Sequence, residues 1–341
     1  MRFCSGANSK DCKDGKDFMA IRIGIVGYGN IGRGVEKAVS AARDMELCAV
    51  FTRRDPAALK LAGSPVPVLP VSVAGKSIGD IDVMVLCGGS ATDLADQGPY
   101  FASMFNIVDS YDTHAKIPEY LSAVDAAAKE TTAIISSGWD PGLFSMMRLL
   151  SESVLPDGMG YTFWGRGVSQ GHSDAIRRVK GVKNAVQYTI PIENAIEAVR
   201  SKAKPKLTAR EKHLRECYVV AEPGADKKEI EETIKAMPNY FADYDTTVNF
   251  IEESEMTASH SKMPHGGMVL HSGRTGENEH ILEFSLKLDS NPEFTGSVMT
   301  AYARAAYRMA GEKNFGAKTV FDIPLAYLSE KTRSSIIKEL L

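Results

Sequence analysis

The sequence predicts an α/β protein built on a doubly wound parallel sheet, with a second, α+β domain inserted into the chain. Three observations lead to this prediction. A short apolar run at residues 21–26 passes through a glycine-rich turn into a helical stretch, and apolar strands alternate with helices as far as residue 136. From Phe144 onward the pattern changes to strand-like runs and glycine-rich, polar segments. Strands that alternate with helices favour a parallel sheet with right-handed crossovers, which is the Rossmann type of fold.

The glycine-rich turn has the spacing of a dinucleotide-binding motif. Residues 27–32 read Gly-Tyr-Gly-Asn-Ile-Gly and fit the pattern G-x-G-x-x-G. Gly27 permits a tight turn, Gly29 lets the backbone approach a pyrophosphate, and Gly32 lets the next helix pack closely. That helix is predicted to run to about Ala42, and its N-terminal N–H groups favour a bound anion. The motif alone is weak evidence, but here it follows a strand and precedes a helix, as it must.

The end of the next predicted strand, residues 47–51, indicates which dinucleotide binds. NAD-binding proteins usually carry an acidic residue about 20 residues beyond the last glycine, where it holds the ribose 2′-hydroxyl. This chain has Thr52-Arg53-Arg54 there instead. One hydroxyl and two guanidinium groups suit a 2′-phosphate, which they can bond and neutralise. We therefore predict NADP as the cofactor; the alternative is that Arg53 and Arg54 are ordinary solvated charges.

Polar loops follow the remaining strands of the predicted sheet. The expected strands and helices alternate at 81–87, 93–105, 106–109, 118–129 and 132–136. Asp112 and Asp140 lie in the loops after the last two of these strands. Because the carboxyl ends of parallel strands meet at one edge of the sheet, we expect both carboxylates at the ligand site. The alternative is that each aspartate only caps the helix that follows, which is the common role of a loop aspartate.

The predicted domain organisation places the second domain between two parts of the first. Residues 1–18 are expected to form a disordered extension, and residues 19–143 the dinucleotide-binding domain. Residues 144–294 are expected to form a substrate-binding and dimerisation domain with a mixed or antiparallel sheet. Residues 295–341 begin with an alanine-rich amphipathic helix and are expected to pack back on the first domain. Within the second domain, strands and helices are predicted at 185–190, 192–203, 217–221, 226–237, 246–252 and 281–288.

Composition and charge exclude several classes of function. The 341 residues carry a net charge of −3 with a pI near 6.2, so no overall basic field favours nucleic acid or an anionic membrane. No apolar run approaches the roughly 20 residues of a transmembrane helix, and the polar first residues lack the apolar core of a secretory signal. The five cysteines are scattered and odd in number, which fits no disulfide framework. We therefore expect a cytoplasmic protein with a small-molecule partner.

Two groups of polar residues suggest other chemistry, which we reject. Ser169, His172 and Asp174 lie close in the sequence, but a Ser-His-Asp triad comes from separated segments and no G-x-S-x-G motif is present. Three further histidines match no zinc spacing and have no partnering cysteine, so no metal is predicted (His260, His265 and His271).

The residues alone lead to an NADP-dependent oxidoreductase that acts on an amino acid. Carboxylates at the ligand site favour a substrate with ammonium groups, and basic residues of the second domain favour carboxylates. Taken alone, however, Arg215 lies in the charged stretch 210–216, which is typical of a solvated helix face or loop. Trp164, taken alone, is predicted to pack in the core.

Longer motifs carry a more specific resemblance. The chain reads, in order, VGYGNIGRGVEKAV, FTRR, LCGGSATD, VDSYDTH, SSGWDPGLFS, TFWGRGVSQGHSDAIRR, AVQYTIP, MPHGG and LKLDSNPEFT. These motifs closely resemble those of the meso-diaminopimelate dehydrogenases, from about Ile21 to the C-terminus. The blocks WGxGxSQGHSDAxRR and GWDPGxFS are highly specific to that family.

The resemblance implies a homodimer that catalyses a reversible, NADP-dependent oxidative deamination. The D-centre of meso-2,6-diaminopimelate is oxidised to L-2-amino-6-oxopimelate, which cyclises to tetrahydrodipicolinate, with release of ammonia and NADPH. The reverse reaction is a reductive amination that feeds lysine and peptidoglycan synthesis in bacteria.

The resemblance also implies which residues make the contacts. Together with the glycine motif, it places cofactor contacts at Gly27, Tyr28, Gly29, Asn30, Ile31, Thr52, Arg53, Arg54, Cys87, Gly88, Gly89, Ser90, Ser110, Tyr111, Asp112, Ser137, Gly138, Trp139, Asp140 and Pro141. It places substrate contacts at Asp112, Asp140, Trp164, Gln170, Gly171, His172, Ser173, Asp174, Thr189, Arg215, His265 and Asn291.

Three of these residues are expected to be catalytic. Asp112 and Asp140 bind the D-centre ammonium or help to move a proton from it. Water then attacks the resulting iminium, and Asp140, His172 or a chain of waters assists this step. At the far end of the substrate, Arg215 is expected to grip the L-centre carboxylate bidentately, and the polar clamp is completed by Thr189, His265 and Asn291.

The sequence departs from the family pattern at two positions, and two alternative functions remain. Gly88 and Arg166 stand where another member has a bulkier residue and a proline. A related dehydrogenase for another amino or hydroxy acid, such as homoserine or dihydrodipicolinate, would share the first domain but not the WGxGxSQGHSD block. A non-enzymatic sensor would bind NADP without turning over any D-amino acid, and the presence of Asp112, Asp140 and Arg215 argues against it.

Overall fold

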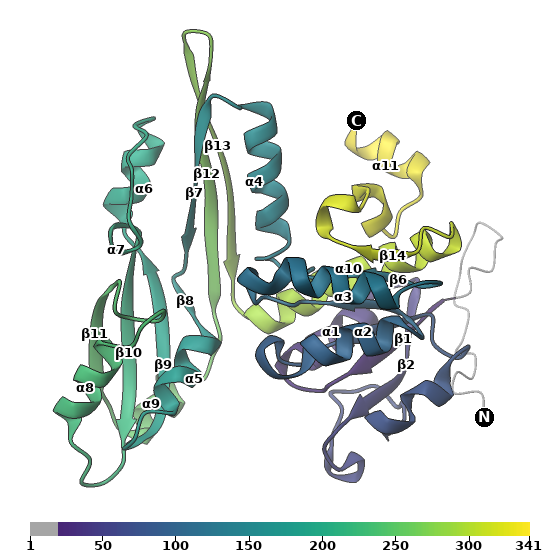
Figure 1. The fold of residues 1–341 in the computed structure, drawn as a ribbon, viewed down its shortest axis with the longest axis horizontal. Coiled ribbons are helices and arrows are strands. Elements are labelled where there is room, and N and C mark those ends of the chain that lie inside the picture. The colour runs from purple at the N-terminus through teal and green to yellow at the C-terminus, as the bar shows by residue number, and fades with distance from the viewer. Residues whose placement is uncertain (1–19) are drawn as a thin grey trace. The chain divides into compact units, whose positions relative to one another are not determined.

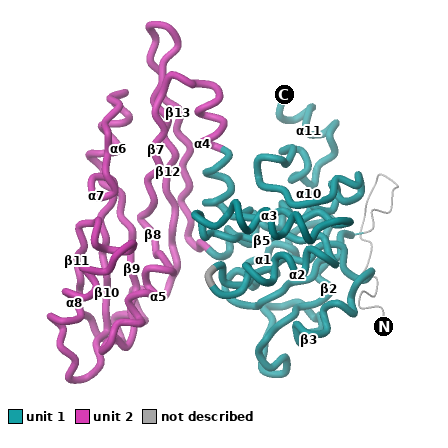
Figure 2. Tube along the Cα trace, viewed as in Figure 1, with its two compact units in different colours: residues 1–146, 292–341 teal, residues 147–291 magenta. Residues whose placement is uncertain are grey.

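The computed structural model describes residues 20–341, so the predicted extension at residues 1–18 lies outside the described chain. The chain divides into two compact units (Figures 1 and 2). The first unit combines the N-terminal part, up to Met146, with residues Pro292–Leu341, and the second unit is formed by Met147–Asn291.

The first unit is built on a seven-stranded sheet with the strand order β14-β6-β5-β4-β1-β2-β3. All of its strand pairs are parallel. This architecture confirms the predicted Rossmann-type sheet. The strands are β1 (Ile21–Val26), β2 (Met45–Thr52), β3 (Val68–Pro70), β4 (Val83–Leu86), β5 (Asn106–Asp109), β6 (Thr132–Ile134) and β14 (Gly316–Lys318).

Helices cover both faces of this sheet, which is why its central strands are continuous apolar runs. One buried cluster joins α1 (Asn30–Ala41) and α10 (Asn291–Gly311) to one face of the sheet. A second cluster joins α2 (Ala95–Ala102) and α3 (Ile117–Ala127) to the other face (Figure 1). The remaining helical segments of the first unit are η1 (Pro56–Ala58), η2 (Val71–Ser77), η3 (Ser90–Leu94), η4 (His114–Lys116), η5 (Val320–Asp322), η6 (Leu325–Leu328) and α11 (Arg333–Leu340).

Two specific contacts fix α10 in the first unit. A Cβ atom on Gly296 would lie 2.5 Å from the backbone of Gly34 in α1, so the two helices approach closely because neither has a side chain at that point. Arg304 is buried and forms two hydrogen bonds with the Asp44 carboxylate, at 2.5 and 2.7 Å. The end of the chain therefore belongs to the same packed unit as the glycine-rich turn.

The second unit contains two sheets instead of the one predicted. The four-stranded sheet has the order β11-β10-β9-β8 and the three-stranded sheet the order β13-β12-β7. Their strands are β7 (Gly158–Trp164), β8 (Gly167–Val168), β9 (Val182–Pro191), β10 (His213–Ala221), β11 (Asp245–Phe250), β12 (His265–Thr275) and β13 (Asn278–Leu288). The helices are α5 (Gln170–Arg177), α6 (Glu193–Arg200), α7 (Ala209–Lys212), α8 (Lys227–Lys235) and α9 (Glu253–Ser259), and α4 (Leu143–Val154) leads into the unit.

Two regular elements have no counterpart among the strands and helices predicted from the sequence. The first is β12, which begins at His265, pairs with β13 along its whole length and pairs with β7 from Gly267 to Gly273. Glycines and histidines hide the apolar alternation that marks a strand, so only the two partner strands define it. The second is α5, whose first part is formed by residues 170–174. Gly171 and the polar side chains around it favour a turn, and packing of Ile176 in the core overrides that preference.

Two expectations drawn from the composition concern disulfides and membrane-spanning helices. Cys87 and Cys217 are free and buried, whereas Cys48 is disulfide-bonded. The expectation that the cysteines take no part in disulfides is therefore wrong for Cys48. Among residues 20–341, every helix is too short or too polar to cross a membrane.

Candidate active site

The glycine-rich turn has the geometry that a phosphate-binding turn needs. Gly27 has a φ of 86°, which side-chain-bearing residues rarely adopt. A Cβ atom on Gly32 would overlap the carbonyl oxygen of Gly27, so the helix packs directly on the turn. A Cβ atom on Gly29 would meet nothing within 4 Å in the described chain, which leaves room for a ligand. The first turn of α1 also lacks an acidic residue and a capping side chain among the described residues, which suits an anion at this helix N-terminus.

A buried glutamate fixes this turn from within α1. Glu36 accepts a hydrogen bond from the Tyr28 hydroxyl, and further bonds of 2.8 to 3.0 Å from the N–H groups of residues 62–64. Burial alone would raise the pKa of Glu36, but the Tyr28 hydroxyl and these N–H groups hold it below its ordinary value. Burial, aided by Glu36, raises the pKa of Tyr28 to about 12. No signal in the sequence points to Glu36, because it resembles any charged residue of a helix until its partners are known.

The two arginines expected to recognise the 2′-phosphate follow the end of β2. The Arg54 guanidinium donates to the carbonyl of Tyr28 inside the turn, and the Arg54 N–H donates to Thr52 Oγ1 at 3.0 Å. Arg53 pairs with Asp93 at 2.8 Å, although 66% of the Arg53 side chain is exposed. The sequence has no carboxylate at the end of β2, where NAD-binding proteins usually carry one, yet η3 after β4 supplies Asp93. A 2′-phosphate would have to share Arg53 with Asp93 or replace it.

The other predicted cofactor segments follow the neighbouring strands, in the sheet order β6-β5-β4-β1-β2. Hydrogen bonds join their loops to one another. Ser90 Oγ accepts from the N–H of Asp112 at 3.0 Å. The N–H and hydroxyl of Ser137 both donate to the carbonyl of Asp109, at 2.9 and 2.8 Å. The structure therefore gathers the five cofactor segments at one edge of the sheet.

The two aspartates expected to act on the substrate lie at this edge. Asp112 is exposed and Asp140 is partly buried. None of the described residues forms a hydrogen bond or an ion pair with the Asp112 carboxylate. The helical segments that follow it begin after Thr113 and Lys116, neither with a side-chain cap. The alternative that Asp112 serves only as a helix cap is therefore wrong.

Arg215 lies on a strand and is buried, whereas its charged surroundings in the sequence are typical of a solvated helix or loop. It occupies the inner face of β10, where alternate residues are buried, and is only 7% exposed. Its guanidinium donates to Thr189 Oγ1 and lies 3.9 Å from the ring centroid of Tyr244. None of the described carboxylates pairs with it, and its Nε atom has no hydrogen-bond partner among the described residues. A buried cation with a free donor can accept a carboxylate from a ligand.

Further predicted substrate residues gather around Met263 in the second unit. Gln170 Nε2 donates to Met263 Sδ at 3.2 Å, and the N–H of Asn291 donates to the Met263 carbonyl at 2.9 Å. His265 begins β12 two residues later, and a Cβ atom on Gly167 would lie 2.5 Å from its Cα. The structure therefore brings Gln170, His265 and Asn291 together around one segment.

His213, which the sequence analysis did not single out, holds Trp164. Its Nε2 atom accepts from the N–H of Trp164 at 2.8 Å, and the two rings stack with centroids 5.3 Å apart. His213 is buried, and burial together with the charge of Arg215 lowers the pKa of His213 to about 3. Its neutral form is therefore the one that orients Trp164.

The segment 169–174 does not form a hydrolase triad. Ser169 Oγ and His172 Nδ1 lie 2.7 Å apart, but Asp174 pairs with Arg177 and its side chain is 52% exposed. Asp174 is thus exposed and paired with a charge of its own helix. Burial and the charge of Arg215 lower the pKa of His172 to about 4, which leaves it neutral near pH 7.

The histidine pattern does not form a metal site. The Tyr188 hydroxyl lies 2.9 Å from His260 Nδ1, and His271 Nε2 lies 2.9 Å from the Leu155 carbonyl. Within residues 20–341, the structure contains no group of three or more metal-ligating side chains.

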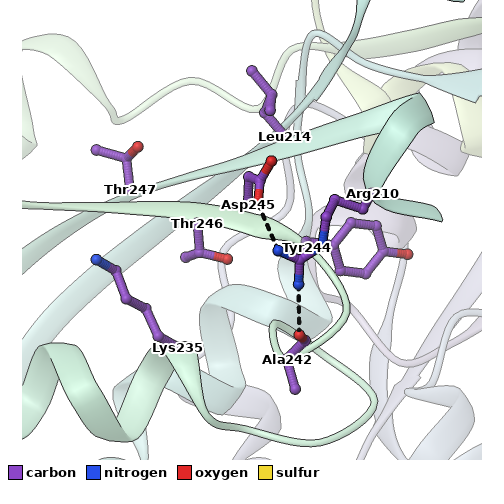
Figure 3. A pocket seen from close by; sticks show the side chains of 8 residues that line it. All are labelled: Arg210, Leu214, Lys235, Ala242, Tyr244, Asp245, Thr246 and Thr247. Carbon is purple, nitrogen blue, oxygen red and sulfur yellow. Dashed lines mark hydrogen bonds and ion pairs between the residues drawn. The ribbon is translucent and has the colours of Figure 1, made fainter. Parts of the chain in front are cut away.

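A pocket of about 410 Å³ opens beside the edge strand β11 (Figure 3). It is lined by Arg210, Leu214, Lys235, Ala242, Tyr244, Asp245, Thr246 and Thr247. None of the predicted substrate residues lines this pocket. Its two cations already have partners, since Arg210 pairs with Asp245 at 2.8 Å and Lys235 with Glu231 at 2.5 Å. We therefore do not assign the substrate to it.

Comparison with known proteins identifies what this chain is similar to. Residues 138–290 match the family model described as the diaminopimelic acid dehydrogenase C-terminal domain. The chain is 63% identical over 327 residues to the meso-diaminopimelate D-dehydrogenase of Lysinibacillus sphaericus, covering 94% of this chain and 99% of the relative. A mutant meso-diaminopimelate dehydrogenase of Clostridium tetani E88, solved with diaminopimelate, superposes with a TM-score of 0.90 at 54% identity and covers 94% and 100% of the two chains. An engineered D-amino acid dehydrogenase bound to NADP⁺ has a TM-score of 0.85 at 42% identity, covering 95% and 100%.

The contact between His213 and Trp164 predicts a dependence of stability on pH. The pKa of His213 is about 3 in the folded chain and about 6.5 in the unfolded chain. Between these values the unfolded chain binds more protons, so the free energy of unfolding falls as pH falls. His213→Gln keeps an acceptor for the Trp164 N–H but does not titrate. We expect its loss of thermal stability between about pH 7 and about pH 5 to be smaller than that of wild type.

The matched control is His280→Gln, because His280 is exposed on β13. This variant should lose as much stability on acidification as wild type does. Equal losses in wild type and His213→Gln would show that His213 does not contribute to the acid sensitivity.

Proposed function

The chain belongs to the meso-diaminopimelate D-dehydrogenase family, and from this premise we propose how its residues carry out the reaction. It is an NADP-dependent oxidoreductase that oxidatively deaminates the D-centre of meso-2,6-diaminopimelate. The products are L-2-amino-6-oxopimelate, ammonia and NADPH, and the reaction belongs to lysine biosynthesis. The buried Arg215 is the observation that best supports an amino-acid substrate. A guanidinium that is buried without a carboxylate partner among the described residues is costly unless a ligand supplies one.

The residues at the carboxyl edge of the first sheet fit the cofactor. The open space at Gly29 and the uncapped N-terminus of α1 suit a pyrophosphate. Arg53 and Arg54 suit the 2′-phosphate, with Arg54 also holding the turn through the Tyr28 carbonyl. When bound, NADP supplies the acceptor for the hydride that leaves the D-centre Cα.

Asp112 and Asp140 act on the D-centre. The exposed Asp112 carboxylate, which has no partner among the described residues, binds the substrate ammonium and takes a proton from it, so that the amine becomes neutral. After the hydride has left, water attacks the iminium carbon and must lose a proton as it does so. Asp140 or the neutral His172 takes that proton, and ammonia then leaves.

The residues of the second unit recognise the L-centre. Arg215 binds the distal carboxylate through its terminal nitrogens and its free Nε, and Thr189 fixes the guanidinium through its hydroxyl. Trp164, oriented by His213, covers the substrate chain. The remaining polar contacts come from Gln170, Gly171, His172, Ser173, His265 and Asn291. The exposed, paired Asp174 is the weakest member of the predicted set.

We further propose that the chain works as a homodimer in the cytoplasm. The second unit provides the dimer face in this proposal. The edge strand β13 supports it, since most of its residues are exposed and one of its sides has no partner strand within the described chain.

Formation of NADPH, followed at 340 nm, tests the function directly. We expect rapid turnover of meso-diaminopimelate with NADP and at least about 100-fold slower turnover of the L,L isomer, which has no D-centre. The D,D isomer and a simple D-amino acid should be poor substrates, because neither presents an L-configured head to Arg215. Tight NADP binding without turnover of any of these compounds would contradict the assignment as an enzyme of this family.

Replacement of Arg215 tests the distal clamp. Arg215→Ala should raise the KM for meso-diaminopimelate by at least about 30-fold, since loss of one partner of a buried charge pair costs about 2 kcal/mol or more. The Kd of NADP should not change. The control is Arg210→Ala, because this neighbour is exposed and pairs only at the edge pocket. An unchanged KM in Arg215→Ala would remove the clamp from the proposal.

Replacement of both arginines after β2 tests the cofactor preference. The double variant Arg53→Ala with Arg54→Ala should raise the Kd of NADP by about 10- to 100-fold, as expected for the loss of charge-assisted bonds to phosphate. The Kd of NAD should change far less, because NAD has no 2′-phosphate. Arg43→Ala, at an exposed position beyond α1, serves as the control. Equal losses for both cofactors would show that the pair does not recognise the 2′-phosphate.

A further inference from the structure

Asp109 is a buried carboxylate to which the proposed mechanism gives no role. It is the last residue of β5 and its side chain is fully buried. None of the described lysines, arginines or histidines pairs with it. A buried acid without a cation lowers stability unless hydrogen bonds satisfy its oxygens. Burial raises the pKa of Asp109, and only the Tyr120 hydroxyl and two N–H groups oppose that rise.

The Asp109 carboxylate joins two loops that are distant in the sequence. One oxygen accepts from the N–H of Tyr111 and the N–H of Ser136, each at 2.9 Å. The other oxygen accepts from the Tyr120 hydroxyl at 2.6 Å. The backbone carbonyl of Asp109 also accepts both bonds from Ser137. A single residue therefore fixes the start of the loop after β5 and the start of the loop after β6.

These two loops carry the proposed catalytic aspartates. Tyr111 directly precedes Asp112, whose own N–H is held by Ser90 on its other side. Ser136 opens the segment that leads to Asp140, and its φ of 54° lies in the left-handed region that residues other than glycine rarely adopt. The bond from its N–H to Asp109 offsets the cost of this conformation.

The surrounding helices are shaped to hold Asp109 in this arrangement. The rings of Tyr111 and Tyr120 stack with centroids 4.1 Å apart, so the loop after β5 packs against helix α3. A Cβ atom on Gly98 of α2 would overlap the Tyr120 hydroxyl. The absence of a side chain at Gly98 thus leaves room for the hydroxyl that bonds to Asp109.

We propose that Asp109 is a positioning residue, which sets the places of Asp112 and Asp140 through its hydrogen-bond acceptors. The inference rests on the proposed roles of those two aspartates. The proposed role requires hydrogen-bond acceptors at position 109 and does not require a negative charge there. An asparagine keeps one oxygen for the N–H groups of Tyr111 and Ser136, and its NH₂ group can donate to Tyr120, whose hydroxyl both donates and accepts.

The test compares Asp109→Ala with Asp109→Asn. Asp109→Ala should lower kcat by about 100-fold, the loss expected when reacting groups move by about 1 Å. The factor should be the same for meso-diaminopimelate and for a simple D-amino acid, because only the D-centre is affected. The Kd of NADP should rise by a smaller factor. The loops after β5 and β6 carry some of the predicted cofactor contacts, but Asp109 does not touch the glycine-rich turn or the arginines after β2. Asp109→Asn should retain kcat within about fivefold of wild type.

Matched variants separate positioning from stability and from the proposed function itself. Tyr120→Phe removes only the third hydrogen bond and should lower kcat by no more than about fivefold. If Asp109→Ala does not fold, the double variant Asp109→Ala with Ser136→Gly replaces it, because glycine adopts the left-handed conformation without strain. That double variant should fold and still show the loss in kcat.

Two results would overturn the inference. The first is a folded Asp109→Ala, or its double variant, with kcat close to wild type. The second is an Asp109→Asn variant as impaired as Asp109→Ala, which would show that the charge and not the acceptors matters. Asp112→Asn is measured in parallel: if that variant is fully active, the proposed role of Asp112 fails, whatever the result at Asp109.

Discussion

The first unit depends on one constraint. Buried polar groups at the carboxyl edge of the parallel sheet need hydrogen-bond partners. Strands buried on both faces must end in loops, and each loop brings N–H groups that need acceptors. Glu36 and Asp109 supply acceptors in the same way, since each accepts from N–H groups of a loop far along the chain. The protein itself satisfies these inner groups, whereas the open space at Gly29 and the carboxylate of Asp112 are left for ligands. Hydrogen bonds thus hold the loops where they leave the sheet, and the outer parts of the loops can contact ligands.

In the second unit a buried cation is left partly unsatisfied, since Arg215 Nε has no hydrogen-bond partner among the described residues. Arg215 has a hydroxyl and an aromatic ring beside it but no carboxylate among the described residues. Burial, aided by the charge of Arg215, lowers the pKa values of the nearby His172 and His213 and keeps both neutral. A ligand carboxylate would therefore complete the arrangement that the chain leaves open. This explains why a residue that looks like a solvated charge in the sequence is placed on the inner face of a strand.

The sequence predicted the parts of the fold that repeat a local pattern and missed those that depend on distant partners. The strands at residues 21–26 and 106–109 were predicted with their observed limits, since burial on both faces produces unbroken apolar runs. The glycine-rich turn was found because each glycine has a local geometric reason. β12 and α5 were missed because glycine, histidine and serine obscure their periods. Asp109 and Ser136 are 27 residues apart, and no local signal shows that they meet. The same holds for Asp93, which reaches Arg53 from another loop.

The positions of the charged residues suggest why the chemical step and the substrate specificity depend on different residues of this protein. The reaction at the D-centre needs a proton acceptor and an aimed C–H bond, and in the proposed mechanism the carboxylates at the edge of the first sheet provide for both. These groups do not distinguish one D-amino acid from another. In the same proposal, discrimination comes from Arg215, since a substrate without a second carboxylate leaves a buried cation uncompensated. Substitutions around Arg215 should therefore change which amino acid is accepted and leave the chemical step intact, whereas substitutions around Asp109 should slow every substrate alike.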